Sequence, residues 1–449
     1  MMRWLAIVLL TATLAEAQTP PPTATQASTT LPKELSLSQA LEIALSNNTT
    51  IREAQSHFDQ IAGQTEKAKS VLLPQLTFDA HQALMTVNLQ GIGIDAPGAH
   101  GVQGPFGSMD ARLNLTMDLL NIANRQSWKS YSSHLDSTRF QIANAREAVT
   151  LNVVGAYLQA LRIKATRDAL NEQTMLANDL YKLTSDRATQ GVSSALDANR
   201  AKQQVNALEQ QRLEAEQSYV AAKLELATLL HVNITDNFEV ADTAAYGSGQ
   251  TMDRDAMIKA ALLARPDYLA AESTMRGAEL ESKSSKSERL PTFKIVASDG
   301  QSGNSPVHNN NTYRVAGVLS IPILDSGRIS GELHDSEARY REATVKRDQL
   351  RAQIEADVLN AISGVEWALK QVATSGENVG LSRQELDLTR ARFTQGVADN
   401  TEVVNAQDRL SRADDASIRA QYTLGLSRAN LARASGEAET TYYKTGKKP

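Results

Sequence analysis

Two stretches of this chain decide its fold: residues 187–201 read RATQGVSSALDANRA, and residues 392–406 read RFTQGVADNTEVVNA. Six of the fifteen aligned positions are identical, including the run Thr-Gln-Gly-Val. Each stretch lies between two long helical patterns, and its glycine is suited to the left-handed conformation that ends a helix. The sequence therefore predicts two helical hairpins. A single copy would be explained as a plain connecting turn, but two copies in equivalent places favour a shared role.

The composition favours long helices over a wide globular core. Only 5% of the 449 residues are aromatic, and aromatic side chains fill much of an ordinary core. The net charge of −5 gives no electrostatic reason to expect a nucleic-acid partner. The chain has no cysteine, which excludes disulfides, cysteine-based zinc sites and a lipid anchor on an N-terminal cysteine.

The N-terminus has the pattern of a secretory signal peptide over residues 1–17. Arg3 supplies the positive end, residues 5–14 are mostly apolar, and Ala-Glu-Ala at 15–17 fits the small-x-small cleavage rule. A short buried helix is the alternative. Residues 18–35 are expected to form a flexible leader. No later stretch approaches about 18 consecutive apolar residues, so the processed chain would enter a membrane only as strands.

The rest of the chain divides into two similar halves, residues 36–250 and 251–436, followed by a C-terminal tail at 437–449. Each half opens with an amphipathic helical pattern, and the first begins with a Ser-to-Gln capping box at 36–39. The Leu-Pro pair at 73–74 recurs 217 residues later, whereas the two tips are 205 residues apart. This spacing predicts two internal structural repeats, of which the first is longer between its proline and its tip.

Four segments alternate apolar and polar side chains with a period of two, near residues 75–87, 111–120, 292–299 and 312–321. Strands of a membrane β-barrel show this pattern, although a half-buried soluble sheet gives the same alternation. The signal peptide favours the membrane interpretation. Because about eight strands are the fewest that close a barrel, four strands per chain predict that several chains share one barrel.

A long helix is predicted before each tip, and a helix with a heptad seam is predicted after it. Residues 122–190 contain one glycine and no proline, so a single helix there would be on the order of 100 Å long. Small and apolar residues recur at four–three spacing over 201–229 and again over 406–434. The hairpin tips are expected at 190–194 and 395–399. Seams of small residues are weak alone, so more helices are expected to pack around them.

Several short motifs occur in a fixed order along the two halves. They are SLSQALEIALSNN at 36–48, the paired Leu-Pro strand entries, LLN at 119–121, ILDSGR at 323–328 and the two Gly-Val tips. With these motifs the chain resembles the TolC-type outer-membrane efflux proteins, or outer membrane factors. The resemblance covers nearly the whole processed chain, and the order and duplication of the motifs make it specific.

The resemblance implies a mainly α chain with β structure that forms a homotrimer. Three chains would contribute four strands each to a 12-stranded β-barrel in outer-membrane lipid, which continues as an α-helical barrel of coiled-coil hairpins in the periplasm. The implied function is the outer-membrane channel of a tripartite efflux or secretion system. Such a channel is a passive export duct that docks an inner-membrane transporter through a periplasmic adaptor, without a cofactor.

By position, the resemblance assigns adaptor docking to the tip residues Gln190, Gly191, Val192, Ser193, Gln395, Gly396, Val397 and Ala398. It assigns the periplasmic entrance to Asp197, Phe393, Glu402 and Asn405. Some family members latch this entrance with a tyrosine and an arginine where this chain has Phe393 and Ala398. Since neither side chain can make the polar latch, packing of Phe393 is expected to replace it.

Carboxylates repeated around a narrow entrance attract cations and hinder anions. Asp197 and Glu402 lie one turn past the tips, so we expect the closed entrance to select cations. The alternative is that both are ordinary acids on a solvent-exposed helix face.

An enzymatic function is not expected. The seven histidines are scattered without metal-ligand spacing, and the chain has no phosphate-binding loop, dinucleotide fingerprint or Gly-x-Ser-x-Gly motif. The competing interpretation is a secreted or surface coiled-coil structural protein without a channel. Such a protein would share the signal peptide and the heptads but would not need four alternating strands. The residues do not identify the exported cargo, the adaptor or the pump.

Overall fold

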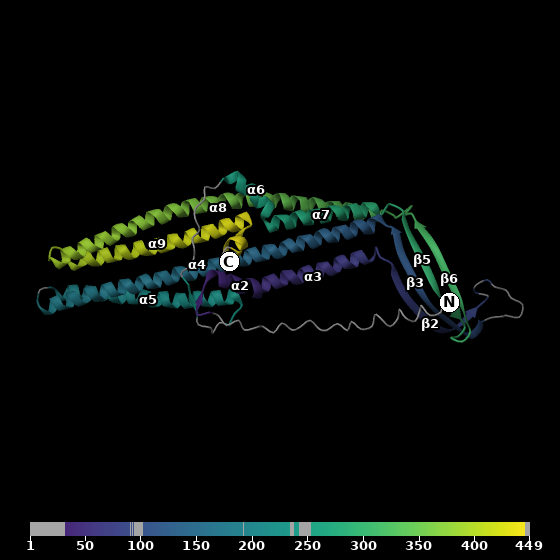
Figure 1. Ribbon diagram of the computed structural model, residues 1–449, viewed down its shortest axis with the longest axis horizontal. Coiled ribbons are helices and arrows are strands. Elements are labelled where there is room, and N and C mark those ends of the chain that lie inside the picture. Colours follow the sequence, from purple (N-terminus) through teal and green to yellow (C-terminus); the bar gives the residue numbers. More distant parts are fainter. Residues whose placement is uncertain are drawn as a thin grey trace.

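The computed structural model describes residues 32–89, 91, 93, 102–191, 193–233, 238–241 and 253–444. They form an elongated molecule, with a four-stranded sheet at one end and two helical hairpins that reach the other (Figure 1). Within these residues, no helix is long and apolar enough to cross a membrane. The predicted signal peptide, the leader up to residue 31, Val192 and residues 445–449 of the tail lie outside the described part of the chain.

The helices come in matched pairs. The first half contains α2 (Leu37–Asn47), α3 (Thr49–Ser70), α4 (Ile122–Thr189) and α5 (Ala195–Leu230). The second half contains α6 (Arg254–Ala264), α7 (Pro266–Ser287), α8 (Arg328–Thr394) and α9 (Asn400–Ser435). A shift of 217 residues carries the limits of α2 and α3 onto those of α6 and α7, and a shift of 205 carries α5 onto α9. The capping box predicted at Ser36 and Gln39 is present at the start of α2.

The sheet is antiparallel, with the strand order β2-β3-β5-β6. Its strands are β2 (Gln75–Asn88), β3 (Val102–Leu120), β5 (Thr292–Gly303) and β6 (Asn309–Ser320). The predicted bounds of β3, β5 and β6 were wrong at the ends farthest from the helices. Glycine and asparagine there favoured loops, but the cross-strand ladder continues through pairs such as Leu84 with Gly107 and Gly303 with Asn309.

The sheet has no buried face in the single chain. None of the residues in β2, β3, β5 and β6 is buried, and large apolar side chains such as Leu76, Phe78 and Tyr313 are more than 60% exposed. A sheet of four strands ordinarily buries one face against a core. These strands therefore need covering by something other than their own chain.

Helix α4 is the central element of the helical part. Near the sheet it packs between α3 and α7, and toward the tips it packs against α5 and α9. Helix α8 packs against α7 and then against α9, so α8 lies at one side of the layer, while α3 and α5 lie at the other (Figure 1). The two hairpins thus run side by side from the middle of the molecule to the tips.

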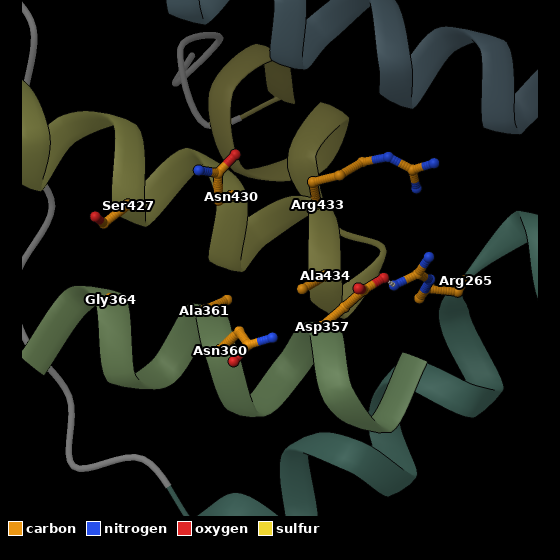
Figure 2. A pocket seen from close by; sticks show the side chains of 9 residues that line it. All are labelled: Arg265, Asp357, Asn360, Ala361, Gly364, Ser427, Asn430, Arg433 and Ala434. Carbon is orange, nitrogen blue, oxygen red and sulfur yellow. Dashed lines mark hydrogen bonds and ion pairs between the residues drawn. The ribbon is translucent and has the colours of Figure 1, made fainter. Parts of the chain in front are cut away.

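The middle of the second half is built around buried charge. Arg265, which is 6% exposed, donates to Asp267 at 2.7 Å and to Asp357 of α8 at 3.0 Å. A polar cavity of about 460 Å³ lies beside this pair, between α8 and α9, and Figure 2 shows the side chains that line it. The guanidinium of Arg433 points away from this cavity and donates to Asn144 of α4.

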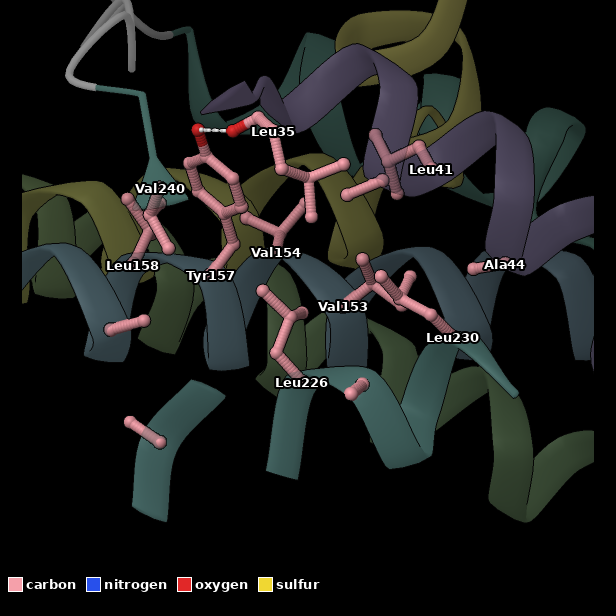
Figure 3. Packing of buried hydrophobic residues seen from close by; sticks show 14 of the residues in the cluster. Leu35, Leu41, Ala44, Val153, Val154, Tyr157, Leu158, Leu226, Leu230 and Val240 are labelled. Atoms are coloured by element: carbon pink, nitrogen blue, oxygen red, sulfur yellow. Dashed lines mark hydrogen bonds between the residues drawn. The ribbon is translucent and has the colours of Figure 1, made fainter. Parts of the chain in front are cut away.

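The middle of the first half is apolar instead. Leu41, Val153 and Leu226 are fully or almost fully buried in one cluster that joins α2, α4 and α5 (Figure 3). The Tyr157 hydroxyl, at the same level, lies 2.9 Å from the carbonyl of Leu35 and 2.7 Å from that of Ala241.

Leu35 ends the short strand β1 (Glu34–Leu35), and Ala241 directly follows the strand β4 (Glu239–Val240), which pairs with β1 in parallel. The prediction of a flexible leader through residue 35 was therefore wrong at its last two residues. Leu35 and Val240 are fully buried beside Tyr157, which holds the pair against α4. Two-residue strands that pair across about 200 positions leave no periodic signal in a sequence.

The start of the predicted tail is also ordered. Glu147, 5% exposed in α4, accepts hydrogen bonds from the backbone amides of Ala438 and Glu439. Arg146 forms a bidentate pair with Glu439 at 2.7 and 2.9 Å. A π-helical turn follows at η2 (Thr440–Lys444). These hydrogen bonds and the ion pair attach the start of the tail to α4.

Candidate functional site

The two hairpin tips have nearly the same backbone. Helices α4 and α8 both end in a left-handed glycine, Gly191 with φ 74° and Gly396 with φ 77°. The side chains of Ser194 and Asp399 then cap α5 and α9. A non-glycine residue would be strained at either glycine. The repeated Thr-Gln-Gly-Val run therefore encodes the reversal of the chain.

The tip residues assigned to docking are mostly exposed. Gln190, Gly191, Gln395 and Gly396 are exposed, and Val397 is 66% exposed. Ser193 and Ala398 are partly covered, and Ala398 packs against the cluster around Phe393. Val192 lies outside the described residues. The tips thus present amide, backbone and apolar groups, with little charge of their own.

Phe393 is buried just below the tips, as expected from its place in the latch position. It is 7% exposed and packs with Leu180 of α4 and with Val403 and Leu410 of α9. Its ring joins the two hairpins, because Leu180 lies in the first and the other residues lie in the second.

Arg187 forms a second link between the hairpins. Its guanidinium carbon lies 4.9 Å from the centroid of the Phe393 ring, and its nitrogens donate to the carbonyls of Phe393 and Thr394 at 3.3 Å each. A cation over an aromatic face is attracted to it, and the carbonyls add two charge-assisted hydrogen bonds.

The sequence prediction did not include Arg187. A signal was nevertheless present, because arginine is the first identical residue of both repeats, Arg187 and Arg392. The two arginines have different partners. Arg392 pairs with Glu402 of its own hairpin at 3.0 Å, and both side chains are about half exposed. Such surface pairs contribute little to stability.

The entrance residues lie as follows. Asp197 is partly exposed and accepts from the Ser193 hydroxyl at 3.3 Å, while its backbone carbonyl accepts from the amide of Asn400 at 2.9 Å. Glu402 and Asn405 are exposed on α9. The Asn400 bond joins the two tips directly, whereas Glu402 is engaged by Arg392.

A sequence profile described as "Outer membrane efflux protein" matches the chain twice, over residues 40–231 and 257–437. The chain belongs to the outer membrane efflux protein family. The two matched segments coincide with the two matched sets of helices. The protein is therefore an outer-membrane efflux protein, and the match favours this function over the secreted coiled-coil scaffold.

Named relatives belong to the same family. The chain is 24% identical to the pyoverdine export outer membrane protein OpmQ of Pseudomonas putida, over 86% of this chain and 82% of that protein. It is 23% identical to Nodulation protein T of Rhizobium leguminosarum bv. trifolii, over 90% of this chain and 83% of that protein.

Solved structures show the same fold. The Vibrio cholerae outer membrane protein VceC aligns with a TM-score of 0.76 and 19% identity, covering 89% of this chain and 96% of VceC. The open-state MtrE outer membrane channel of Neisseria gonorrhoeae aligns with a TM-score of 0.75 and 19% identity, covering 90% and 89%. The fold of this efflux family member is thus that of outer-membrane channels.

Proposed function

We propose that three copies of this chain form a passive export duct, with a shared 12-stranded β-barrel in the outer membrane and an α-helical barrel in the periplasm. The observation that carries the proposal is a sheet with two open edges and no buried face. Four strands cannot close on themselves, whereas twelve can. In the closed ring, β2 of one copy pairs with β6 of the next.

The helical part supports the same ring. Helices α5 and α8 lie at opposite sides of the layer and carry exposed apolar side chains. On α5 these are Leu196, Leu213, Val220 and Leu224, and on α8 they include Leu359, Trp367, Leu381 and Leu388. Neighbouring copies would bury these side chains in the gap between α8 of one chain and α5 of the next.

The two halves are proposed to be structural repeats. A shift of 217 residues carries α2 and α3 onto α6 and α7, a shift of 205 carries α5 onto α9, and one family profile matches each half separately. Three chains would then present six similar hairpins around one axis. The proposed partners follow from this arrangement: the exposed tips dock a periplasmic adaptor, which connects the duct to an inner-membrane transporter that supplies the energy.

The entrance is proposed to close between the two hairpins of each chain. Arg187 and the buried Phe393 ring bridge them on one side, and Asn400 bonds the Asp197 carbonyl on the other. This arrangement takes the place of a tyrosine–arginine latch. Opening the duct requires these contacts between the hairpins to separate.

Conductance in planar lipid bilayers tests both the duct and its closure. Wild-type protein should give small steps of conductance. Arg187→Ala should give larger steps, because it removes the contacts with Phe393 and Thr394. Arg392→Ala is the matched control, since its exposed pair lies within one hairpin. Absence of any conductance in all three proteins would contradict the duct, and equal conductance in all three would contradict the closure.

Ion selectivity is proposed to depend on Asp197 and Glu402. Three copies would place six carboxylates near the narrow end of the duct, where a ring of like charge favours cations. Reversal potentials in a salt gradient measure this preference. The double variant Asp197→Asn, Glu402→Gln should lose most of it, and an unchanged reversal potential would refute the assignment.

A further inference from the structure

The first half carries unbalanced positive charge where its helices meet the strands. Residues 64–73 and 121–132 contain Lys67, Lys69, Arg125 and Lys129, and Glu66 is the one acidic residue in these two segments. All four basic side chains are exposed. Among the residues that the structure describes, none of the four forms an ion pair.

At the same level of the second half, residues 281–290 and 326–337, five acidic residues balance four basic ones. Arg328 at the start of α8 pairs with Glu288 at 2.7 Å, and Lys283 near the end of α7 pairs with Glu279 at 2.6 Å. Arg339 adds a pair with a third carboxylate, Glu281, at 3.0 Å. The excess of positive charge is therefore a property of the α3–α4 junction and not of the whole rim.

A cavity of about 480 Å³ lies within this basic region, between α3 and α4. It is lined by Gln64, Lys67, Ala68, Val71, Asn124, Ser127 and Tyr131. The Lys67 ammonium and the Ser127 and Tyr131 hydroxyls can all donate hydrogen bonds, and none has a recorded side-chain partner among the described residues. Ala68 and Val71 supply an apolar part of the lining.

The corresponding positions of the second half could not bind an anion in this way. The shifts of 217 and 205 residues that superimpose the helices carry Gln64 onto Glu281, Val71 onto Glu288 and Ser127 onto Glu332. Carboxylates at these three places repel negative charge. The α3–α4 cavity therefore differs from the equivalent place in the second half, because its lining has no carboxylate.

We propose that the α3–α4 cavity binds the phosphate headgroup of an anionic phospholipid in the periplasmic leaflet of the outer membrane. The proposal rests on the proposed placement of the strands in that membrane. Lysine binds phosphate as a point charge, while hydroxyls and an amide fix its oxygens. Val71 and Ala68 then contact the glycerol and the start of the acyl chains. Three basic residues outside the cavity also attract the anionic membrane surface: Lys69, Arg125 and Lys129.

Native mass spectrometry can count lipids retained by the whole protein from mixed micelles of phosphatidylglycerol and phosphatidylcholine. Wild-type protein should retain phosphatidylglycerol preferentially. The variant Lys67→Gln, Lys69→Gln, Arg125→Gln, Lys129→Gln should retain at least about tenfold less, because each basic group near an anionic surface changes binding about fivefold.

The matched control removes four other exposed basic residues that have no recorded ion pair: Lys33→Gln, Arg52→Gln, Lys182→Gln, Lys259→Gln. It has the same net charge as the first variant and should bind lipid like the wild type. Lys67→Gln alone should weaken retention more than Lys129→Gln alone, because only Lys67 lines the cavity.

Several results would overturn the inference. Equal retention by the two fourfold variants would show that general charge, and not this junction, attracts the lipid. Equal retention of the two lipids by wild-type protein would exclude selection of anionic headgroups, and displacement by inorganic phosphate would make free phosphate the ligand. If the wild-type protein does not enter lipid bilayers at all, the proposed function fails instead, so the two failures are distinguishable.

Discussion

The middle of the first half and the middle of the second half solve the same packing problem with different chemistry. At matching positions of α4 and α8, Val153 and Val358 are both almost fully buried. Around them the first half has Asn48 where the second has Arg265, a buried arginine held by two aspartates. The first half is packed by a large apolar cluster, whereas the second half combines a smaller apolar cluster with ion pairs beside a polar cavity.

This difference shows how one helical frame can have two kinds of stability. Apolar packing loses free energy in proportion to the atoms removed. A buried ion pair adds little net stability over an apolar pair, but the loss of one partner leaves the other charge buried and unpaired. The second half should therefore be the more sensitive of the two to single charge removals and to acid.

Arg265→Ala is expected to have the largest effect. It leaves Asp267 without its buried partner, which should lower the local free energy of unfolding by about 3–5 kcal/mol. Asn48→Ala, at the matching position, removes only the cap on the Thr50 amide and should lower it by about 1 kcal/mol. Native-state hydrogen exchange in α7 and α3 measures both values, and similar losses would contradict the contrast.

Leu226→Ala is expected to come next. Its side chain is fully buried in the apolar cluster, so truncation should cost about 2–5 kcal/mol of local stability. Leu431, its match in α9, is only partly buried, and Leu431→Ala should cost clearly less. Hydrogen exchange rates in α5 and α9 measure the loss of local stability that each variant causes. A larger loss of stability for Leu431→Ala than for Leu226→Ala would mean that the second half depends more on apolar packing.

Tyr157→Phe should have a smaller effect that is confined to the first half. The change removes the hydroxyl beside the Leu35 and Ala241 carbonyls and should lower local stability by about 1 kcal/mol. Faster exchange of the Glu239 and Ala241 amides, which donate to the carbonyls of Lys33 and Leu35, would report it. Unchanged exchange there would show that Tyr157 does not hold the β1–β4 pair.

The smallest expected effect is a difference in acid sensitivity. Burial acts to raise the pKa of Asp267, but the hydrogen bond and charge of Arg265 outweigh it and leave that pKa below its usual value. A carboxyl group whose pKa is lowered by folding stabilises the protein at pH values above its pKa in the unfolded chain, which is about 3.9 for aspartate. This stabilisation is lost as the pH falls through the pKa of the folded state.

The region around α7 should therefore open more readily as the pH falls below about 4. Asp267→Asn should remove that dependence. The matching position in the first half is Thr50, which does not titrate, and α3 serves as the internal reference. Hydrogen exchange corrected for its intrinsic pH dependence measures both regions. An equal acid response in wild-type and variant α7 would assign the sensitivity to other carboxyl groups.

Local sequence signals are sufficient for the two reversal points and for the start of the helix that follows each of them. Glycine at a left-handed position and a serine or aspartate cap act within a few residues of the turn, so Gly191, Gly396, Ser194 and Asp399 could be predicted from the chain alone. Packing of Phe393 was expected from the family resemblance, which places this residue where some members have a latch tyrosine.

Long-range polar contacts could not be predicted in the same way. The bonds of Arg187 cross about 200 positions to the other hairpin, and Arg265 finds Asp357 about 90 positions away. Arg187 recurs as Arg392 in the second repeat, and Arg265 stands two residues before Asp267, but neither local pattern names the distant partner that the arginine reaches. The β1–β4 pair could not be predicted either, because its two short strands are about 200 positions apart. Tyr157 and the apolar cluster hold the two strands together.

The native mass of the protein extracted from membranes in detergent tests the central claim most directly. The account predicts a particle with three times the mass of one processed chain, since only then do the four strands of each copy close into a twelve-stranded barrel. A monomer, or a dimer that stays soluble without detergent, would leave both edges of the sheet open and would contradict the shared channel.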